Sequence, residues 1–146
     1  MQTNEKEQVA RNIYECFNEH NLDKMTNFMS DQLQWFDMST GLVMKGKSSY
    51  RQYDENWLKG FPDGKITIKN LLVAGECVIV EFVGKGTHTG TLNTQQGDIP
   101  PSGKTVELPF CDVLLIRDGK VIEGHSYYDR MSLIEQVKAE RMRAAA

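Results

Sequence analysis

The sequence lacks the features that mark several large classes of protein. Its three cysteines are odd in number, widely spaced and form no CxxC pair, which favours a reduced, cytoplasmic protein. No apolar run approaches the roughly 20 residues that a membrane span requires, and the polar first residues show no signal peptide. The net charge of −3 is not the basic balance typical of nucleic-acid binding. We therefore expect a cytoplasmic protein that binds neither membranes nor nucleic acid.

Motifs for metals and nucleotides are also scarce. The three histidines, His20, His88 and His125, are far apart, and no Cys/His spacing typical of a metal site occurs. Residues 41–48 do fit the phosphate-binding pattern GxxxxGKS. That pattern requires a strand–loop–helix unit that leads into a parallel sheet, whereas antiparallel strands are expected here. We therefore expect neither a metal site nor a phosphate loop.

The length and composition that remain are those of one globular domain. The chain has 146 residues, of which 40% are hydrophobic and 25% charged. A chain of this length buries enough surface to form a core without disulfides. We expect a single domain over residues 1–146, with fraying at residues 1–4 and 139–146.

Hydrophobic periodicity separates a helical first part from a β-rich second part. An apolar stripe over residues 9–17, a short segment at 22–29 and a segment from about 48 to 61 predict helices. Extended segments are predicted at 33–38, 66–73, 77–89, 105–117 and 120–128, with a loop over 93–103 and a helix after Asp129. This order favours an α+β fold, with helices packed on one face of a curved antiparallel sheet.

A turn near the end of the chain predicts which side chains meet. Residues 118–119 are Asp-Gly, a signal for a two-residue hairpin turn, which fixes the register of the two flanking strands. In that register Asp112 lies opposite His125, with Cβ atoms about 5 Å apart, and Phe110 lies opposite Tyr127. A carboxyl and an imidazole in such an apolar setting suit general acid/base chemistry near neutral pH. A structural Asp–His hydrogen bond is the alternative.

Further candidates lie on the preceding strand and on the third helix. His88 follows Gly84 and Gly86 on one strand face, where missing side chains leave room for a ligand; the alternative is a buried structural histidine. Four aromatic residues share one face of the helix and can line a pocket for a flat apolar ligand or simply form core: Tyr50, Tyr53, Trp57 and Phe61.

Several blocks of the sequence occur together in one known family. These blocks, which span nearly the whole chain, are residues 86–90, 99–104, 116–123 and 128–137. In this order and spacing they resemble the SnoaL-like polyketide cyclases, of the nuclear-transport-factor-2-like superfamily. The resemblance implies a cone-shaped α+β barrel, in which a curved antiparallel sheet wraps around N-terminal helices and encloses a pocket.

The resemblance also implies an activity. It implies cofactor-free ring closure of a polyketide by intramolecular aldol chemistry, with an aspartate as acid/base, a histidine nearby and a homodimeric assembly. The chain departs from the usual Gln-Leu-Gly ending of the family, since it has Gln136-Val137-Lys138. Related pockets serve isomerases, dehydratases and epoxide hydrolases, so the fold alone does not select one reaction.

We therefore expect an enzyme that cyclises or isomerises a small hydrophobic carbonyl compound, without a cofactor. Asp112 and His125 are the expected acid/base pair, and His88 is expected to donate a hydrogen bond to a substrate oxygen. The expected pocket wall consists of Tyr50, Tyr53, Trp57, Phe110 and Tyr127.

Two functions of other classes stay open as alternatives. One is a non-catalytic binder of a small apolar ligand. The other is an interaction module that dimerises through its outer sheet face. In the predicted register this face pairs small and apolar residues, which suits a homodimer: Leu115 with Ile122, Val113 with Gly124, and Cys111 with Ser126.

Overall fold

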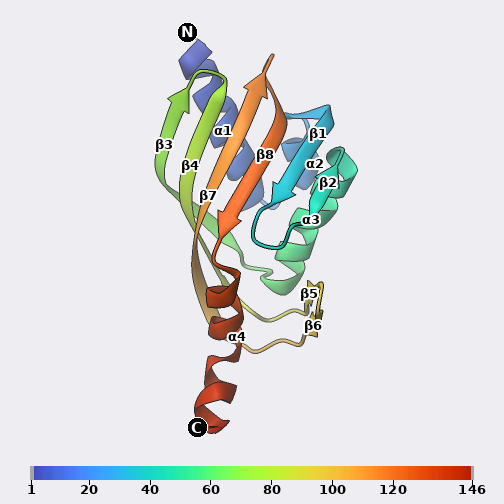
Figure 1. Ribbon diagram of the computed structural model, residues 1–146, viewed down its shortest axis with the longest axis vertical. Helices are drawn as coiled ribbons and strands as arrows, with labels where there is room; N and C mark the ends of the chain where they lie inside the picture. The colour runs from blue at the N-terminus through green and yellow to red at the C-terminus, as the bar shows by residue number, and fades with distance from the viewer. Residues whose placement is uncertain (1, 146) are drawn as a thin grey trace.

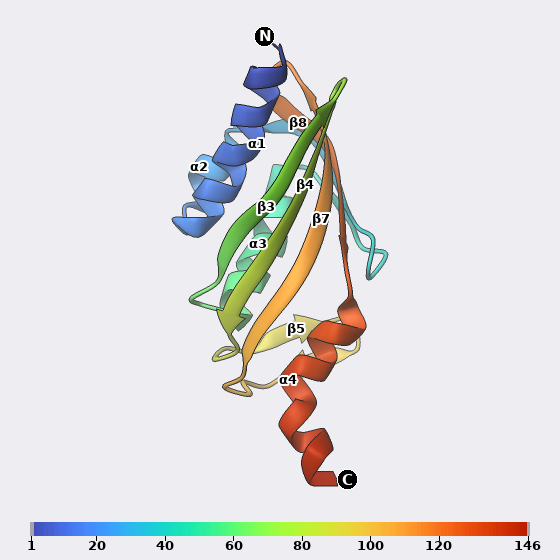
Figure 2. The ribbon, with the colours of Figure 1, turned by 90° about the vertical axis from the view of Figure 1, so that its left-hand side faces the viewer.

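Three helices lie against the concave face of one curved sheet, as Figure 1 shows from the front and Figure 2 from the side. The computed structural model describes residues 2–145, with side chains for residues 5–138, so the fraying expected at 1–4 and 139–146 lies outside the fully described part. The helices are α1 (Gln2–Asn18), α2 (Leu22–Thr26), α3 (Lys47–Gly60) and α4 (Arg130–Ala145). None of the helices within residues 2–145 is long and apolar enough to cross a membrane.

The main sheet has six strands in the order β2-β1-β8-β7-β4-β3. Their bounds are β1 (Met29–Asp37), β2 (Val43–Lys45), β3 (Lys65–Ala74), β4 (Cys77–Thr87), β7 (Thr105–Arg117) and β8 (Lys120–Tyr128). The predicted α+β class is confirmed, with N-terminal helices held in the curve of the sheet. The sheet differs from the expected antiparallel barrel in two respects. It does not close, and β1 pairs with β8 in parallel. Parallel strands need a long connection, and most of the chain lies between β1 and β8.

Most predicted elements lie within a few residues of the observed ones. The second helix ends earlier than predicted, because Met29 already begins β1. The predicted loop over 93–103 contains a small hairpin of β5 (Leu92–Thr94) and β6 (Gly97–Ile99). The GxxxxGKS segment forms no phosphate loop: its middle residues are the edge strand β2, which is antiparallel to β1.

The start of α3 lies close to the predicted one at about residue 48. The helix begins at Lys47, Gly46 occupies the N-cap position with φ of +89°, and no side chain caps it. This positive φ is readily adopted only by glycine. Gly46 therefore sets the angle at which the chain leaves the sheet edge and enters the helix.

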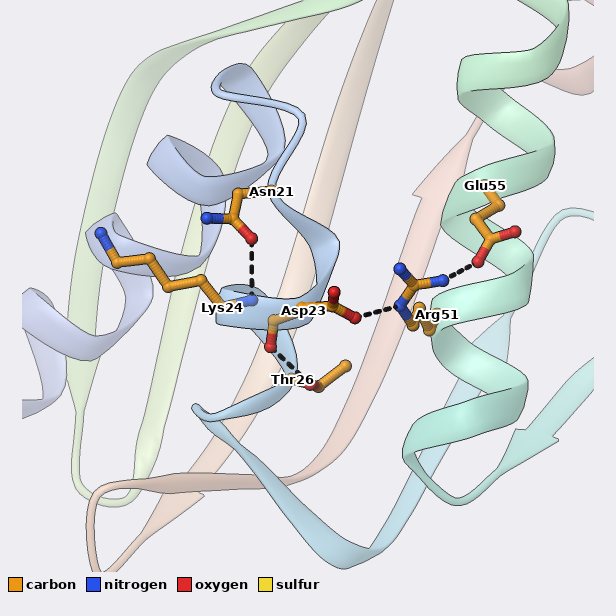
Figure 3. Close-up of polar contacts among 6 residues, drawn as sticks. All are labelled: Asn21, Asp23, Lys24, Thr26, Arg51 and Glu55. Carbon is orange, nitrogen blue, oxygen red and sulfur yellow. Dashed lines mark hydrogen bonds and ion pairs between the residues drawn. The ribbon is translucent and has the colours of Figure 1, made fainter.

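Two surface contacts hold the N-terminal helices in place. At the end of α1, the Asn18 side chain accepts a hydrogen bond from the Ile66 amide (2.6 Å) and donates one to the Ile66 carbonyl (2.9 Å), which fastens α1 to β3. Between α2 and α3, Arg51 Nε binds Asp23 Oδ1 at 3.0 Å and a second guanidinium nitrogen binds Glu55 (Figure 3). Exposed ion pairs contribute at most about 1 kcal/mol each.

A β-bulge shifts the register of the β7–β8 hairpin. The turn at residues 118–119 forms as predicted, and Ile116 still pairs with Val121. One step further, however, Leu115 pairs with Glu123, so that Ile122 is left without a partner residue. A single extra residue of this kind bends the strand and reverses the faces of all residues beyond it.

The bulge separates the two residues that the turn predicted to meet. Asp112 pairs with Ser126, and both side chains face the interior, 3% and 4% exposed. His125 pairs with Val113 instead and faces outward. The predicted Asp112–His125 pair is therefore wrong, because the bulge adds one unpaired residue to β8.

The outer face of this hairpin is also more polar than the predicted one. The predicted partners on β8 were Ile122, Gly124 and Ser126. The observed neighbours are Cys111 with Tyr127, Val113 with His125, and Leu115 with Glu123. Homodimerisation through this face stays a prediction.

A glycine allows a large aromatic side chain to lie across the sheet. Trp35 on β1 pairs with Gly124 on β8. A Cβ atom added to Gly124 would lie 2.3 Å from indole atoms Cε3 and Cζ3. The indole in turn contacts the ring of Tyr50 on α3, with centroids 4.6 Å apart. Gly124 thus sets the depth at which the indole packs between sheet and helix.

Substitution of Gly124 by alanine is expected to destabilise the protein by about 1–3 kcal/mol, because the new methyl group overlaps the indole. The free energy of unfolding, measured by urea denaturation, tests this. Gly84→Ala is the matched control on β4, where the added Cβ would come no closer to another residue than 3.2 Å, at Cε1 of Phe110. An equal loss in both variants would contradict the argument.

Candidate active site

An apolar pocket lies between the helices and the concave face of the sheet. Its walls come from α1, α3 and the inner faces of β1, β4, β7 and β8. Aromatic rings dominate the lining and include Tyr14, Trp35, Tyr50, Trp57, Phe82 and Phe110. Two carboxyl groups, those of Asp54 and Asp112, interrupt this apolar lining. Such a shape, apolar with a few convergent polar groups, is typical of small-molecule sites.

Four of the five predicted wall residues lie in this lining: Tyr50, Tyr53, Trp57 and Phe110. Tyr127 does not, because the bulge turns it to the outer face, where it is 44% exposed. Tyr128 pairs with Phe110 in place of Tyr127 and packs against the Phe110 ring, with centroids 4.9 Å apart, but it lines a second pocket and not this one.

Asp112 projects from β7 into the pocket. The Tyr14 hydroxyl donates a hydrogen bond of 2.7 Å to Asp112 Oδ2. The other oxygen, Oδ1, is fully buried and has no well-formed hydrogen bond within the described residues. Burial raises the pKa of Asp112 to about 7, the Ser126 and Tyr14 hydroxyls lower it, and the negative charge of Asp37 raises it. A carboxyl with this pKa is suited to exchange a proton near neutral pH, and the acid/base role of Asp112 stays a prediction.

Asp54 is a second buried carboxyl, which the sequence interpretation missed. It lies on α3, one turn after Tyr50 and one turn before Trp57, and is 7% exposed. Burial raises its pKa to about 8; a hydrogen bond with Tyr50 opposes this, and the charge of Asp112 adds to it. The sequence did carry a signal for this. Asp54 lies four residues after Tyr50 and three before Trp57, so it shares the buried face of the aromatic stripe.

Asp37, at the end of β1, is a third buried carboxyl with a different environment. Its Oδ2 accepts hydrogen bonds from the hydroxyls of Tyr53 (2.7 Å) and Tyr128 (2.8 Å). Its Oδ1 accepts from the backbone amides of Ser39 (2.9 Å) and Thr40 (3.0 Å). All four donors meet a side chain that is only 2% exposed. The interior thus holds one carboxyl with both oxygens hydrogen-bonded and two carboxyls whose pKa burial raises, to about 7 for Asp112 and about 8 for Asp54.

The two predicted histidines lie outside the pocket lining. His125 is on the outer face, where its Nε2 lies 3.2 Å from Glu123 Oε2 and its ring contacts Phe36. His88 is fully buried but organises the loop after β4. Its backbone carbonyl accepts from the amides of Ser102 and Gly103, and its Nδ1 accepts from the Ser102 amide at 3.2 Å.

The surroundings of the His88 ring favour its neutral form. Burial lowers its pKa, although the Ile99 carbonyl opposes this. The ring also contacts Phe61, with centroids 5.5 Å apart. These contacts favour the structural alternative for His88. Among the described residues, no group of three His, Cys, Asp or Glu side chains is placed to hold a metal ion.

The sequence and the fold both have known counterparts. Residues 7–137 match the family described as SnoaL-like polyketide cyclase. No curated protein matches the chain.

Among solved structures, a candidate SnoaL-like polyketide cyclase from Jannaschia sp. CCS1 is 18% identical, with a TM-score of 0.83 and 94% of each chain covered. The candidate polyketide cyclase IdmH from Streptomyces antibioticus is 19% identical, with a TM-score of 0.77 and coverage of 90% of this chain and 97% of that one. TerC, co-crystallised with polyporic acid, is 14% identical, with a TM-score of 0.74 and coverage of 92% and 98%. At these identities the likeness concerns the fold.

The raised pKa of Asp54 predicts a pH dependence of stability. The unfolded carboxyl titrates near pH 4, and the folded one at about 8. Between these values the folded state holds one more proton than the unfolded state. The free energy of unfolding therefore falls as pH rises from about 4 to about 8, by at most about 1.4 kcal/mol per pH unit for this group.

Asp54→Asn removes this contribution, so its stability relative to the unchanged protein should rise between about pH 5 and about pH 8. Urea denaturation at the two pH values measures the difference. The exposed Asp23→Asn, whose ion pair with Arg51 appears in Figure 3, is the control and should show a small, nearly constant difference. A pH-independent difference for Asp54→Asn would contradict its raised pKa.

Proposed function

The chain belongs to the SnoaL-like polyketide cyclase family, and from this premise we propose that it is an enzyme that cyclises or isomerises a small, hydrophobic carbonyl compound. One observation carries the proposal. A carboxyl group with a pKa of about 7 reaches into an aromatic-lined pocket and keeps one oxygen without a well-formed hydrogen bond. Such a group is suited to take a proton from a carbon next to a carbonyl.

The pocket walls indicate the kind of substrate. Tyr50 and Tyr53 stack nearly parallel, with ring planes 29° apart, and Trp57 meets the Tyr53 ring edge-on. Ring faces of this kind contact flat, apolar molecules over a large area. The co-crystallisation of TerC with polyporic acid supports a small organic ligand in this fold. We therefore assign an aromatic or polycyclic ketone of polyketide type to the pocket.

The pKa values of the two pocket carboxyls differ, and the difference suits one to act as a base and the other as an acid. Asp112, with the lower pKa of about 7, is ionised first and acts as the base; Asp54, with a pKa of about 8, keeps its proton and acts as the acid. The Asp112 carboxylate takes the proton from the α-carbon. The enolate carbon then forms the new C–C bond to a second carbonyl, and Asp54 gives its proton to the oxygen of that carbonyl.

Return of the proton from Asp112 to Asp54 restores the starting state, so the cyclisation consumes and releases no net proton. In an isomerisation the same base returns the proton to another carbon. The tyrosines keep their protons throughout, because burial raises the pKa of Tyr14 and Tyr50 well above the usual value. Tyr14 therefore acts as a fixed donor that orients Asp112 rather than as a base.

Asp112→Asn is expected to reduce turnover at least about 100-fold, because the amide cannot accept the proton. The assay incubates the protein with a panel of polycyclic ketones, polyketide esters, epoxides and steroids. Thermal shift reports binding, and chromatography with mass spectrometry reports conversion. The control is His125→Asn, on the outer face of the sheet, which should retain turnover. Conversion that survives Asp112→Asn would refute the assignment, and binding without any conversion would favour a non-catalytic binder.

The two carboxyls also predict a narrow pH profile. The reaction needs Asp112 ionised and Asp54 protonated, so kcat/KM should rise through about pH 7 and fall above about pH 8. Rates across this range measure both limbs. Asp54→Asn should remove the falling limb and lower kcat, because the proton donor is lost. A wild-type profile that stays flat across this range would exclude this pair as acid and base.

A further inference from the structure

Three buried polar side chains form a row across adjacent strands. Asp37 on β1 pairs with Ser126 on β8, and Ser126 pairs with Asp112 on β7. All three are nearly inaccessible, with 2%, 4% and 3% of their surface exposed. Paired residues on one sheet face have Cβ atoms about 5 Å apart. Ser126, with its small side chain, therefore lies between the two aspartates in this row.

Asp37 carries the fixed charge in this row. Its oxygens accept from two tyrosine hydroxyls and two backbone amides, and none of these four donors is charged. Backbone amides can only donate, and the two hydroxyls donate here as well, so this arrangement matches a carboxylate. The negative charge is thus stabilised where it sits but is not neutralised.

The other groups around Asp112 carry no charge at the pH at which it titrates. From α1 and α3 these are Tyr14, Tyr50 and Asp54, whose raised pKa values keep them protonated. From β4 the facing residue is the apolar Val80.

Two lysines also line the pocket, but each is bound elsewhere. The Lys65 ammonium donates to the Asn18 carbonyl, and the Lys85 ammonium pairs with Glu107 at 3.4 Å. The charge that acts on Asp112 from the adjoining elements is therefore that of Asp37.

We propose that Asp37 is a positioning residue for the acid/base group: its buried negative charge, acting past Ser126, adds to the effect of burial in holding a proton on Asp112 and so strengthens Asp112 as a base when that proton is lost. The inference concerns the protonation of Asp112 and can be tested without substrate, while its catalytic consequence rests on the proposed function. Ser126 and Tyr14 act in the opposite sense, because their hydrogen bonds favour the carboxylate.

The test follows the titration of Asp112 directly. Aspartate labelled with ¹³C at the side-chain carboxyl carbon is incorporated, and the Asp112 signal is assigned by its loss in Asp112→Asn. In Asp37→Asn the proton affinity of Asp112 should fall about tenfold or more, because a nearby like charge has been removed. In Ser126→Ala it should rise, because a donor to the carboxylate has been removed.

Asp54→Asn is the matched control. It makes the same substitution in the same interior, but Asp54 is uncharged while Asp112 titrates, so the proton affinity of Asp112 should change by less than about twofold. Should Asp37→Asn fail to fold, Asp37→Ser makes the same test, since it keeps an oxygen acceptor and removes the charge. An unchanged Asp112 titration in the charge-free variant, or equal shifts in it and Asp54→Asn, overturns the proposal.

The effect of Asp37 on catalysis is measured separately. If the panel identifies a substrate, the rising limb of kcat/KM in Asp37→Asn should move to lower pH together with the titration of Asp112. A titration that moves while the rising limb does not refutes the catalytic consequence but leaves the electrostatic inference intact. Absence of turnover in the unchanged protein refutes the proposed function, and the NMR titration still decides the role of Asp37.

Discussion

The burial of carboxyl groups in an apolar interior is the constraint on which the site depends. A charged carboxylate loses its hydration there, so it must either gain hydrogen-bond donors or keep its proton. Asp37 follows the first course, with four donors. Asp54 and Asp112 follow the second. The curved sheet and α3 bury all three residues away from water, with Asp54 and Asp112 in the lining of the apolar pocket and Asp37 in the lining of a second pocket.

The aromatic residues serve this arrangement as well as the pocket shape. Tyr53 is both a wall of the pocket and a donor to Asp37. Tyr14 likewise lines the pocket and donates to Asp112. A phenol that donates to a carboxyl has an apolar ring for the ligand and a fixed polar end for the protein. The same side chains therefore exclude water and hold the carboxyl groups in place.

Local sequence signals predicted the elements well, because periodicity and turns depend on neighbouring residues. The aromatic stripe of α3 identified one wall, and the Asp-Gly turn at residues 118–119 identified the last hairpin. The position of Asp112 in the pocket also agrees with the prediction. Its partner was predicted wrongly, because nothing in the sequence around Ile122 marks a bulge. Asp37 could not be identified as a site residue, since its donors come from α3, β8 and the following turn.

The bulge at Ile122 also bears on how this hairpin diverges among relatives. If both strands kept the register that the turn sets, with Ile122 paired to Leu115, His125 and not Ser126 would lie opposite Asp112. The presence or absence of the bulge, without any substitution, therefore decides whether the carboxyl faces a serine or an imidazole. Alignments of relatives that place gaps only in loops would miss such a change. Comparisons of catalytic residues across these strands should therefore count positions from the pocket rather than from the turn.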